Sequence, residues 1–121
     1  MLEISFYKVK KTERAEGSLV IGVLLDPLHN IYKAHFPGNP ITPGVCLLQM
    51  ALELLTTNFK RNLRLTEAKN IKYLKVINPI ENPEIEFNIR YKLEGDLILA
   101  DINIVAGETL FTKVSATYKG L

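Results

Sequence analysis

The feature that most constrains the fold is an apolar segment that directly follows three prolines. Residues 43–60 read PGVCLLQMALELLTTNFK and consist mostly of good helix formers. Pro43 suits the first position of a helix, and the hydroxyl of Thr42 can cap its start. Apolar residues fall on every side of this helix, which predicts that it is buried all round. The helix is too short and its end is too polar for it to span a membrane.

Most of the remaining chain has the pattern of β-strands. Residues 84–94 show the clearest period of two, with one apolar and one polar face. Short turns around Gly95 and Gly107 join three consecutive strands, which must therefore be antiparallel neighbours. The strands expected from these patterns are 17–26, 71–78, 84–94, 97–106 and 110–118, with a weaker signal at 4–8. The sequence predicts an α+β fold in which an antiparallel sheet encloses one long helix, as a single domain over residues 1–121.

Composition and charge exclude several classes of function. The chain has 121 residues, 47% of them hydrophobic, and a net charge of +2, and it has no recognisable nucleic-acid-binding module. Cys46 is its only cysteine, so no internal disulfide can form and no cysteine pair is present to bind a metal. The charged N-terminus is unlike a secretory signal. We expect a cytoplasmic protein without cofactor, metal, nucleic-acid or membrane partner.

Two polar residues interrupt the apolar helix and require an explanation. Gln49 and Glu53 are four residues apart, so they share one face, and the amide of Gln49 can donate to the carboxylate of Glu53. Burial of an unpaired amide costs about 1–3 kcal/mol, and burial of a lone carboxylate costs more. The pair is either self-satisfied or turned toward a partner subunit, unless it has a chemical role.

The segment before the helix favours a chemical role. The N–H groups of Gly44 and Val45 have no partners within the helix and point outward with the positive end of its dipole. Gly44 has no side chain, so a substrate carbonyl could approach its backbone closely. His35 precedes it in a proline-rich loop and can act as a base near neutral pH, although most loop histidines are structural. We assign His29 to that structural class.

The segment HFPGNPITPGV resembles the signature of the hotdog-fold (3R)-hydroxyacyl-acyl carrier protein dehydratases. The later segment YLKVINPIENPEIEF and the closing strands resemble that family in order and spacing, over roughly residues 17–120. The resemblance implies that His35 removes the α-proton of a 3-hydroxyacyl thioester while the Gly44 amide polarises its carbonyl. It also implies that Val45, Phe36 and Pro43 contact the substrate.

One position departs from the family pattern. The family's helix carboxylate, contributed by the other subunit, would fall five residues after Gly44, where this chain has Gln49. A glutamine amide cannot act as a general acid. Our hypothesis is that the pair has exchanged places, so that Glu53, its pKa raised by burial, acts directly or through a water while Gln49 orients it. The rival is that Gln49 only binds substrate and dehydration is lost.

The resemblance also implies partners. Because hotdog domains place their sites where two subunits meet, we expect a homodimer or a trimer of dimers. Basic side chains follow the helix and either keep the surface soluble or dock an acidic acyl carrier protein; they are Lys60, Arg61, Arg64, Lys69, Lys72 and Lys75. The predicted function is dehydration of a carrier-bound 3-hydroxyacyl thioester. The alternatives are a hotdog thioesterase and a non-catalytic carrier-binding subunit, which could pair with an active homologue that supplies the acid.

Overall fold

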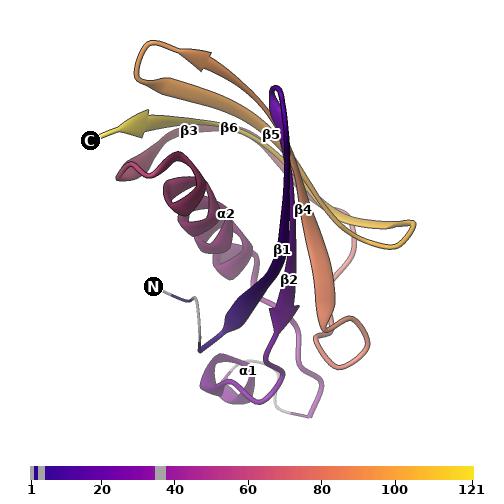
Figure 1. The fold of residues 1–121 in the computed structure, drawn as a ribbon. Coiled ribbons are helices and arrows are strands. Elements are labelled where there is room, and N and C mark those ends of the chain that lie inside the picture. Colours follow the sequence, from indigo (N-terminus) through magenta and orange to yellow (C-terminus); the bar gives the residue numbers. More distant parts are fainter. Residues whose placement is uncertain (1, 3–4, 35–37) are drawn as a thin grey trace.

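A computed structural model describes residues 2, 5–34 and 38–121. In this part of the chain, six strands and two helices follow one another as shown in Figure 1. The elements are β1 (Tyr7–Ala15), β2 (Ser18–Leu25), α1 (Asn30–Ala34), α2 (Gly44–Phe59), β3 (Leu63–Tyr73), β4 (Glu84–Glu94), β5 (Leu97–Ala106) and β6 (Thr109–Gly120).

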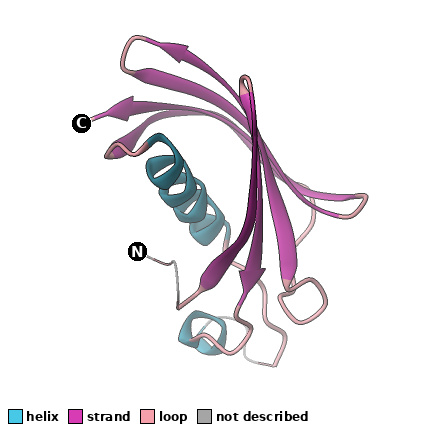
Figure 2. Cartoon of the chain, viewed as in Figure 1, coloured by secondary structure: helices cyan, strands magenta, loops and turns pink. Residues whose placement is uncertain are grey.

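The strands form one antiparallel sheet in the order β1-β2-β4-β5-β6-β3. The sheet curves around α2, which lies against its concave face (Figures 1 and 2). β3, which follows the helix, reaches the edge of the sheet beside β6 rather than pairing with its neighbours in sequence. The predicted α+β architecture, an antiparallel sheet curved around one long helix, is therefore observed.

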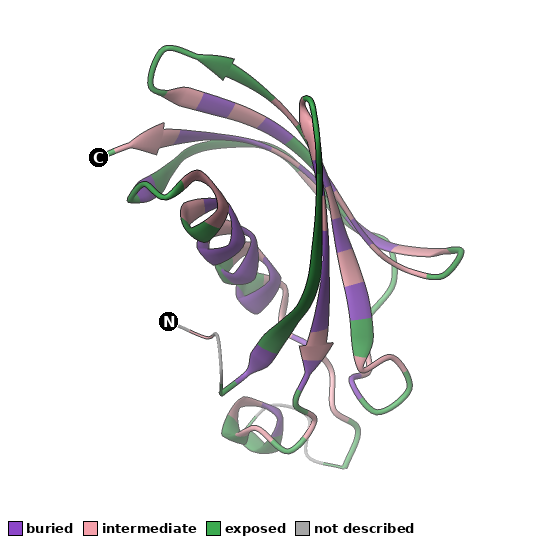
Figure 3. Cartoon of the chain, viewed as in Figure 1, coloured by how far each residue is buried: buried purple, intermediate pink, exposed green. Residues whose placement is uncertain are grey.

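The core lies between α2 and the inner face of the sheet. Met50 and Leu55 of α2 are fully buried, as are Ile85, Phe87 and Ile89 of β4. Burial alternates along the inner strands, which is visible as banding in Figure 3. This is the pattern expected where one face of a strand meets the core and the other meets water.

Three tight turns connect the hairpins, and two of them were expected from glycine positions. Gly95 has φ +60° in the β4–β5 turn, and Gly107 has φ +58° in the β5–β6 turn. Such left-handed backbone is favourable for glycine because no Cβ meets the carbonyl oxygen. The bounds of β4 match the predicted 84–94.

The expectation that α2 is buried all round is wrong for this chain by itself. Val45 is 71% exposed, and Gln49 is exposed as well. The sheet covers only one side of α2, so a stripe on the other side stays open, consisting of Val45, Leu48, Gln49, Leu52 and Thr56. This stripe is largely apolar.

The helix cap also differs from the prediction. α2 begins at Gly44, and Pro43 is the N-cap with extended backbone (φ −62°, ψ 141°) and no side-chain cap hydrogen bond. The hydroxyl of Thr42 instead pairs with the hydroxyl of Tyr32 at 2.9 Å, and both residues are buried. Thr42 therefore joins the proline segment to α1 rather than capping α2.

Two strand predictions were wrong in position. The strand expected at 71–78 is β3, which runs from Leu63 to Tyr73, and a loop follows it. The weak signal at 4–8 belongs to β1, which extends to Ala15. Both are edge strands with mostly exposed side chains, so neither carries the alternation that marks the inner strands.

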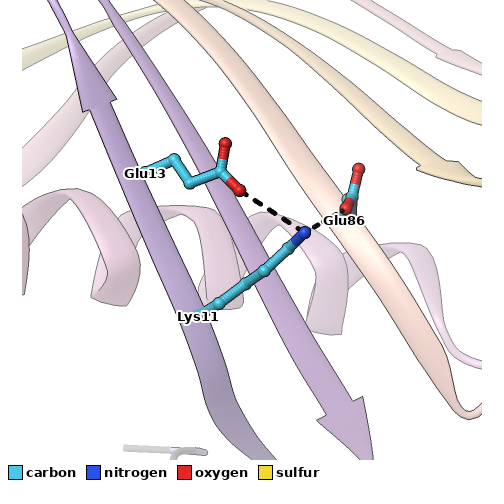
Figure 4. A network of polar contacts seen from close by, with 3 residues as sticks. All are labelled: Lys11, Glu13 and Glu86. Carbon is cyan, nitrogen blue, oxygen red and sulfur yellow. Dashed lines mark ion pairs between the residues drawn. The ribbon is translucent and has the colours of Figure 1, made fainter.

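A cross-strand ion-pair network links the edge strand β1 to β4 across β2. Lys11 lies 3.5 Å from Glu13 on its own strand and 3.4 Å from Glu86 on β4 (Figure 4). Its side chain crosses Gly22 of β2, where a Cβ would lie 3.1 Å from Lys11 Cγ. Glu86 and then Glu13 raise the pKa of Lys11. The absence of a side chain at Gly22 allows Lys11 to reach across β2 to β4.

Candidate active site

The carboxylate of Glu53 lies inside the molecule and accepts hydrogen bonds from three separate segments. The Gln49 amide donates to Oε2 at 2.9 Å, and the backbone N–H of Leu2 donates to the same oxygen at 2.8 Å. The hydroxyl of Tyr7 donates to Oε1 at 3.0 Å. Glu53 is only 3% exposed. The predicted Gln49–Glu53 hydrogen bond is confirmed, and these donors fix the orientation of the carboxylate.

Aromatic contacts hold the N-terminal segment beside Glu53. The ring of Phe6 stacks on Tyr32 with centroids 5.2 Å apart, and it meets His29 edge-on at the same separation. The Phe6 N–H donates to the carbonyl of Leu2, which ties Leu2, the donor to Glu53, to the ring that stacks on Tyr32. Nδ1 of His29 accepts from the N–H of Ile31, so His29 has the structural role assigned to it.

The start of α2 presents free amide groups. The N–H groups of Cys46 and Leu47 donate to the carbonyl of Pro43. Among the described residues, no hydrogen bond uses the N–H of Gly44 or Val45. Such unpaired groups, together with the helix dipole, attract an oxyanion or a polarised carbonyl oxygen. The N–H groups that the sequence analysis assigned to carbonyl binding therefore have no partner among the described residues.

The space beside Gly44 contains the ring of Tyr73, which is the last residue of β3. A Cβ on Gly44 would lie 2.5 Å from Cζ and 2.6 Å from the hydroxyl oxygen of Tyr73. Tyr73 is 53% exposed, and partial burial raises the pKa of its phenol. The close approach that the glycine permits is thus used by a tyrosine of the same chain.

Two predicted residues lie outside the part of the chain that the structure describes. These are His35, the predicted base, and Phe36, a predicted substrate contact. Their roles stay predictions. The described segments on either side of them are α1, which ends at Ala34, and the proline segment that leads to Pro43.

Comparison with known proteins identifies the family. The family model described as ApeI dehydratase, ApeI-like, matches residues 10–100, well over half of the chain. The chain belongs to the ApeI-like dehydratase family. A search of curated protein sequences gives no significant match.

Solved structures support the fold of this ApeI-like chain. The dehydratase heterocomplex ApeI:P from Xenorhabdus doucetiae contains a chain that is 16% identical, with a TM-score of 0.72 and coverage of 92% of this chain and 96% of that one. The protein yhdA from Lactococcus lactis, which carries a provisional thioesterase assignment, is 12% identical, with a TM-score of 0.69 and coverage of 97% and 93%. The phenylacetic acid degradation protein PaaI from Thermus thermophilus is 13% identical, with a TM-score of 0.62 and coverage of 97% and 95%. The predicted hotdog fold and the predicted kinship with hotdog dehydratases are confirmed.

Helix geometry separates the two halves of the candidate site within one chain. An α-helix rises about 1.5 Å per residue, so Gln49 lies about 7.5 Å and Glu53 about 13.5 Å along the axis from Gly44. The carbonyl and the leaving hydroxyl of a 3-hydroxyacyl thioester are only a few bonds apart. This separation of the two backbone positions favours a Glu53 carboxylate from another chain for a substrate bound at Gly44.

The basic residues divide into groups at opposite ends of α2. Lys60, Arg61 and Arg64 follow the C-terminus of α2, about 24 Å along the axis from Gly44. The guanidinium of Arg61 packs over Gly120. Lys72 and Lys75 are exposed close to Tyr73, whose ring touches Gly44. The second group is nearer to the candidate carbonyl site.

Three participants in this arrangement had no recognisable signal in the sequence. Tyr7 and Leu2 reach Glu53 from 46 and 51 residues away. Tyr73 was expected to lie inside a strand, with no special relation to Gly44. The curvature of the sheet brings the end of β3 to the start of α2 and so creates that contact. No local sequence motif predicts it.

Proposed function

We propose that this chain is a dehydratase that removes water from a 3-hydroxyacyl thioester carried on acyl carrier protein and forms the trans-2-enoyl thioester. The observation that carries the proposal is the pair of unbonded amides at Gly44 and Val45, at the helix start that the HFPGNPITPG segment leads into. Membership of the ApeI-like dehydratase family supports the reaction class.

In the proposed reaction, the thioester carbonyl oxygen binds the Gly44 amide, which stabilises the negative charge that develops when the α-proton leaves. His35 takes that proton. The electron pair of the broken C–H bond forms the double bond, and the C–O bond to the hydroxyl breaks. A protonated Glu53 carboxyl gives its proton to the departing hydroxyl, so that water leaves. Gln49 orients the carboxyl group.

The acid in this scheme comes from a second copy of the chain. The separation of about 13.5 Å between the two backbone positions along one helix supports a Glu53 from another chain. A homodimer, or a trimer of dimers, would bring a second α2 to the site. The open apolar stripe on α2 and the edge of β3 that pairs with no described strand support such an assembly, since both would otherwise face water.

A second candidate is a subunit that binds carrier-borne substrate without supplying the acid. Its support is that Glu53 is buried and engaged by Leu2, Tyr7 and Gln49, while Gln49 occupies the position of the family acid. A homologous subunit would then contribute the carboxylate. The solved relative from Xenorhabdus doucetiae is named a dehydratase heterocomplex, which gives a precedent for mixed assembly in the family.

The acidic carrier protein would dock near Lys72 and Lys75. These exposed cations flank Tyr73 and Leu74 in sequence, at the end of β3 that reaches Gly44, and the side chain of Lys72 lies on the outer face of the sheet. Opposite charges across such a surface steer the encounter and fix its orientation.

The test uses purified protein with 3-hydroxyacyl and saturated acyl thioesters, and it measures enoyl product against free thiol. The proposal expects enoyl product and its loss in both His35→Ala and Glu53→Gln. Free thiol from both substrates would instead identify a thioesterase. Full dehydration by Glu53→Gln would refute the exchanged-pair hypothesis. If the purified protein by itself shows no turnover, and Gln49→Glu or an added homologue restores it, the second candidate is favoured.

A further inference from the structure

Tyr73 places a hydroxyl group beside the amide that the proposed function assigns to the substrate carbonyl. Its oxygen lies 2.6 Å from the position that a Cβ on Gly44 would occupy. Cα–Cβ bonds in a helix tilt toward its N-terminus, which is also the direction of the first unpaired N–H groups. The phenol therefore lies beside Gly44, close to the helix start at which these N–H groups are exposed.

We propose that the hydroxyl of Tyr73 donates a second hydrogen bond to the thioester carbonyl that the Gly44 amide binds. This inference rests on the proposed function and makes Tyr73 a catalytic residue that touches the substrate. Two donors on one carbonyl oxygen stabilise the charge that develops there better than a single amide does.

The state of the phenol suits this role. Burial raises its pKa, so it keeps its proton at neutral pH and remains a donor. The hydrogen bonds of the described residues include none that engages the Tyr73 hydroxyl. The side chain is 53% exposed, so a ligand can reach it without displacing the ring from Gly44.

The strand next to Tyr73 adds a second polar group at this end of the inner face. Thr112 of β6 is the register partner of Tyr73, so the two side chains share a face of the sheet. Thr112 is fully buried, and its hydroxyl has no hydrogen-bond partner among the described residues. A buried hydroxyl of this kind is uncommon, and it lies in the strand pair that brings Tyr73 to the start of α2.

The test compares Tyr73→Phe with Tyr91→Phe. Both changes keep an aromatic ring and remove one hydroxyl, but Tyr91 packs on Phe59 at the other end of α2. We expect Tyr73→Phe to lower kcat about 100-fold, as is typical for loss of one donor to a developing oxyanion, while KM changes little. Tyr91→Phe should keep both constants. Unchanged kcat in Tyr73→Phe would overturn the inference and leave the proposed dehydratase intact.

Gly44→Ala provides a second variant that depends on the same contact. The added methyl would overlap the ring, and because the phenol is the far end of a movable side chain, the ring would swing away. The double variant Gly44→Ala/Tyr73→Phe should then be scarcely worse than Gly44→Ala alone. Fully additive losses would contradict a shared role.

A binding measurement separates this inference from the proposed function. The probe is a pantetheine thioester with an isotope-labelled carbonyl, whose infrared stretch is recorded bound to each variant. Hydrogen bonds weaken the C=O bond, so the stretch should move to higher wavenumber in Tyr73→Phe but not in Tyr91→Phe. This shift would support the contact even if the wild-type protein does not turn over. An identical stretch in the wild type and in Tyr73→Phe would refute it.

Discussion

Tyr7 and Glu53 form a buried hydrogen bond of 3.0 Å that joins the first strand to the central helix. Tyr7 is 1% exposed and Glu53 is 3% exposed, so the contact is shielded from water. Removal of a donor to a buried carboxyl group leaves an acceptor unsatisfied, which costs more than the loss of a hydrogen bond at the surface. The pair anchors the segment that carries the Leu2 amide and also fixes one oxygen of the proposed catalytic carboxylate.

Removal of the Tyr7 hydroxyl should therefore destabilise the fold. We expect Tyr7→Phe to lower the free energy of unfolding by about 1–3 kcal/mol, measured by urea denaturation. Tyr118→Phe is the matched control, because Tyr118 is equally buried but lies in β6 and donates to no carboxylate in the described structure. Equal losses in the two variants would show that the Glu53 contact contributes nothing specific.

Replacement of Gln49 by glutamate should make stability depend on pH. The Gln49→Glu variant places two carboxyl groups where a 2.9 Å hydrogen bond now exists, so one of them should hold its proton to a higher pH in the folded than in the unfolded chain. Such a group adds stability at low pH and loses it as the pH rises. The variant should be less stable than wild type at neutral pH and should approach it as the pH falls. Gln49→Ala, which adds no charge, should show no such trend in urea denaturation.

Much of the fold could be predicted from the sequence because apolar and polar residues alternate along the inner strands as their burial does. The alternation in 84–94 gave the bounds of β4, and the turns around Gly95 and Gly107 gave the antiparallel meander. β1 and β3 escaped because they are edge strands, where exposed polar residues occupy most positions on both faces. The predicted cap at Thr42 was wrong because the hydroxyl of Thr42 pairs with that of Tyr32, which is ten residues earlier in the chain.

Charge reversal near Tyr73 should weaken carrier-bound turnover selectively. We expect Lys72→Glu/Lys75→Glu to raise KM for a carrier-borne 3-hydroxyacyl substrate at least tenfold, about 1.4 kcal/mol, and to leave a small thioester analogue unaffected. Lys60→Glu/Arg64→Glu is the matched control at the far end of α2 and should have a smaller effect. A larger effect from this control pair would move the docking surface to the C-terminal end of α2.

Two buried tyrosines should make the fold sensitive to alkali. Desolvation raises the pKa of Tyr32 and of Tyr118 from 10.0 to about 12. An unfolded chain loses these protons at lower pH than the folded chain, so stability should fall as the pH rises from about 10 toward 12. Unfolding followed against pH should show this loss, and Tyr118→Phe should reduce its steepness. A slope unchanged in that variant would mean that Tyr118 ionises normally in the fold.

The candidate site was predictable only where its members are neighbours in sequence. The Gln49–Glu53 pair and the free amides of Gly44 and Val45 follow from helix geometry alone, and both are observed. The approach of Tyr7 to Glu53 and of Tyr73 to Gly44 depends on how the sheet wraps the helix. Contacts of that kind carry no periodic signal, so the sequence did not reveal them.

The strand order has a consequence for the order in which parts of the chain fold. β4, β5 and β6 pair with their immediate neighbours in the chain, as β1 does with β2, so these ladders close over short loops. The β2–β4 and β3–β6 pairings join segments that are distant in the chain. Closing these longer loops costs more chain entropy, so we expect these pairings to form later. We expect amide protons of the β4–β6 meander to gain protection from exchange first during refolding, and those of β3 to gain it last. β3, the strand that brings Tyr73 to α2, would then be the last part of the molecule to fold.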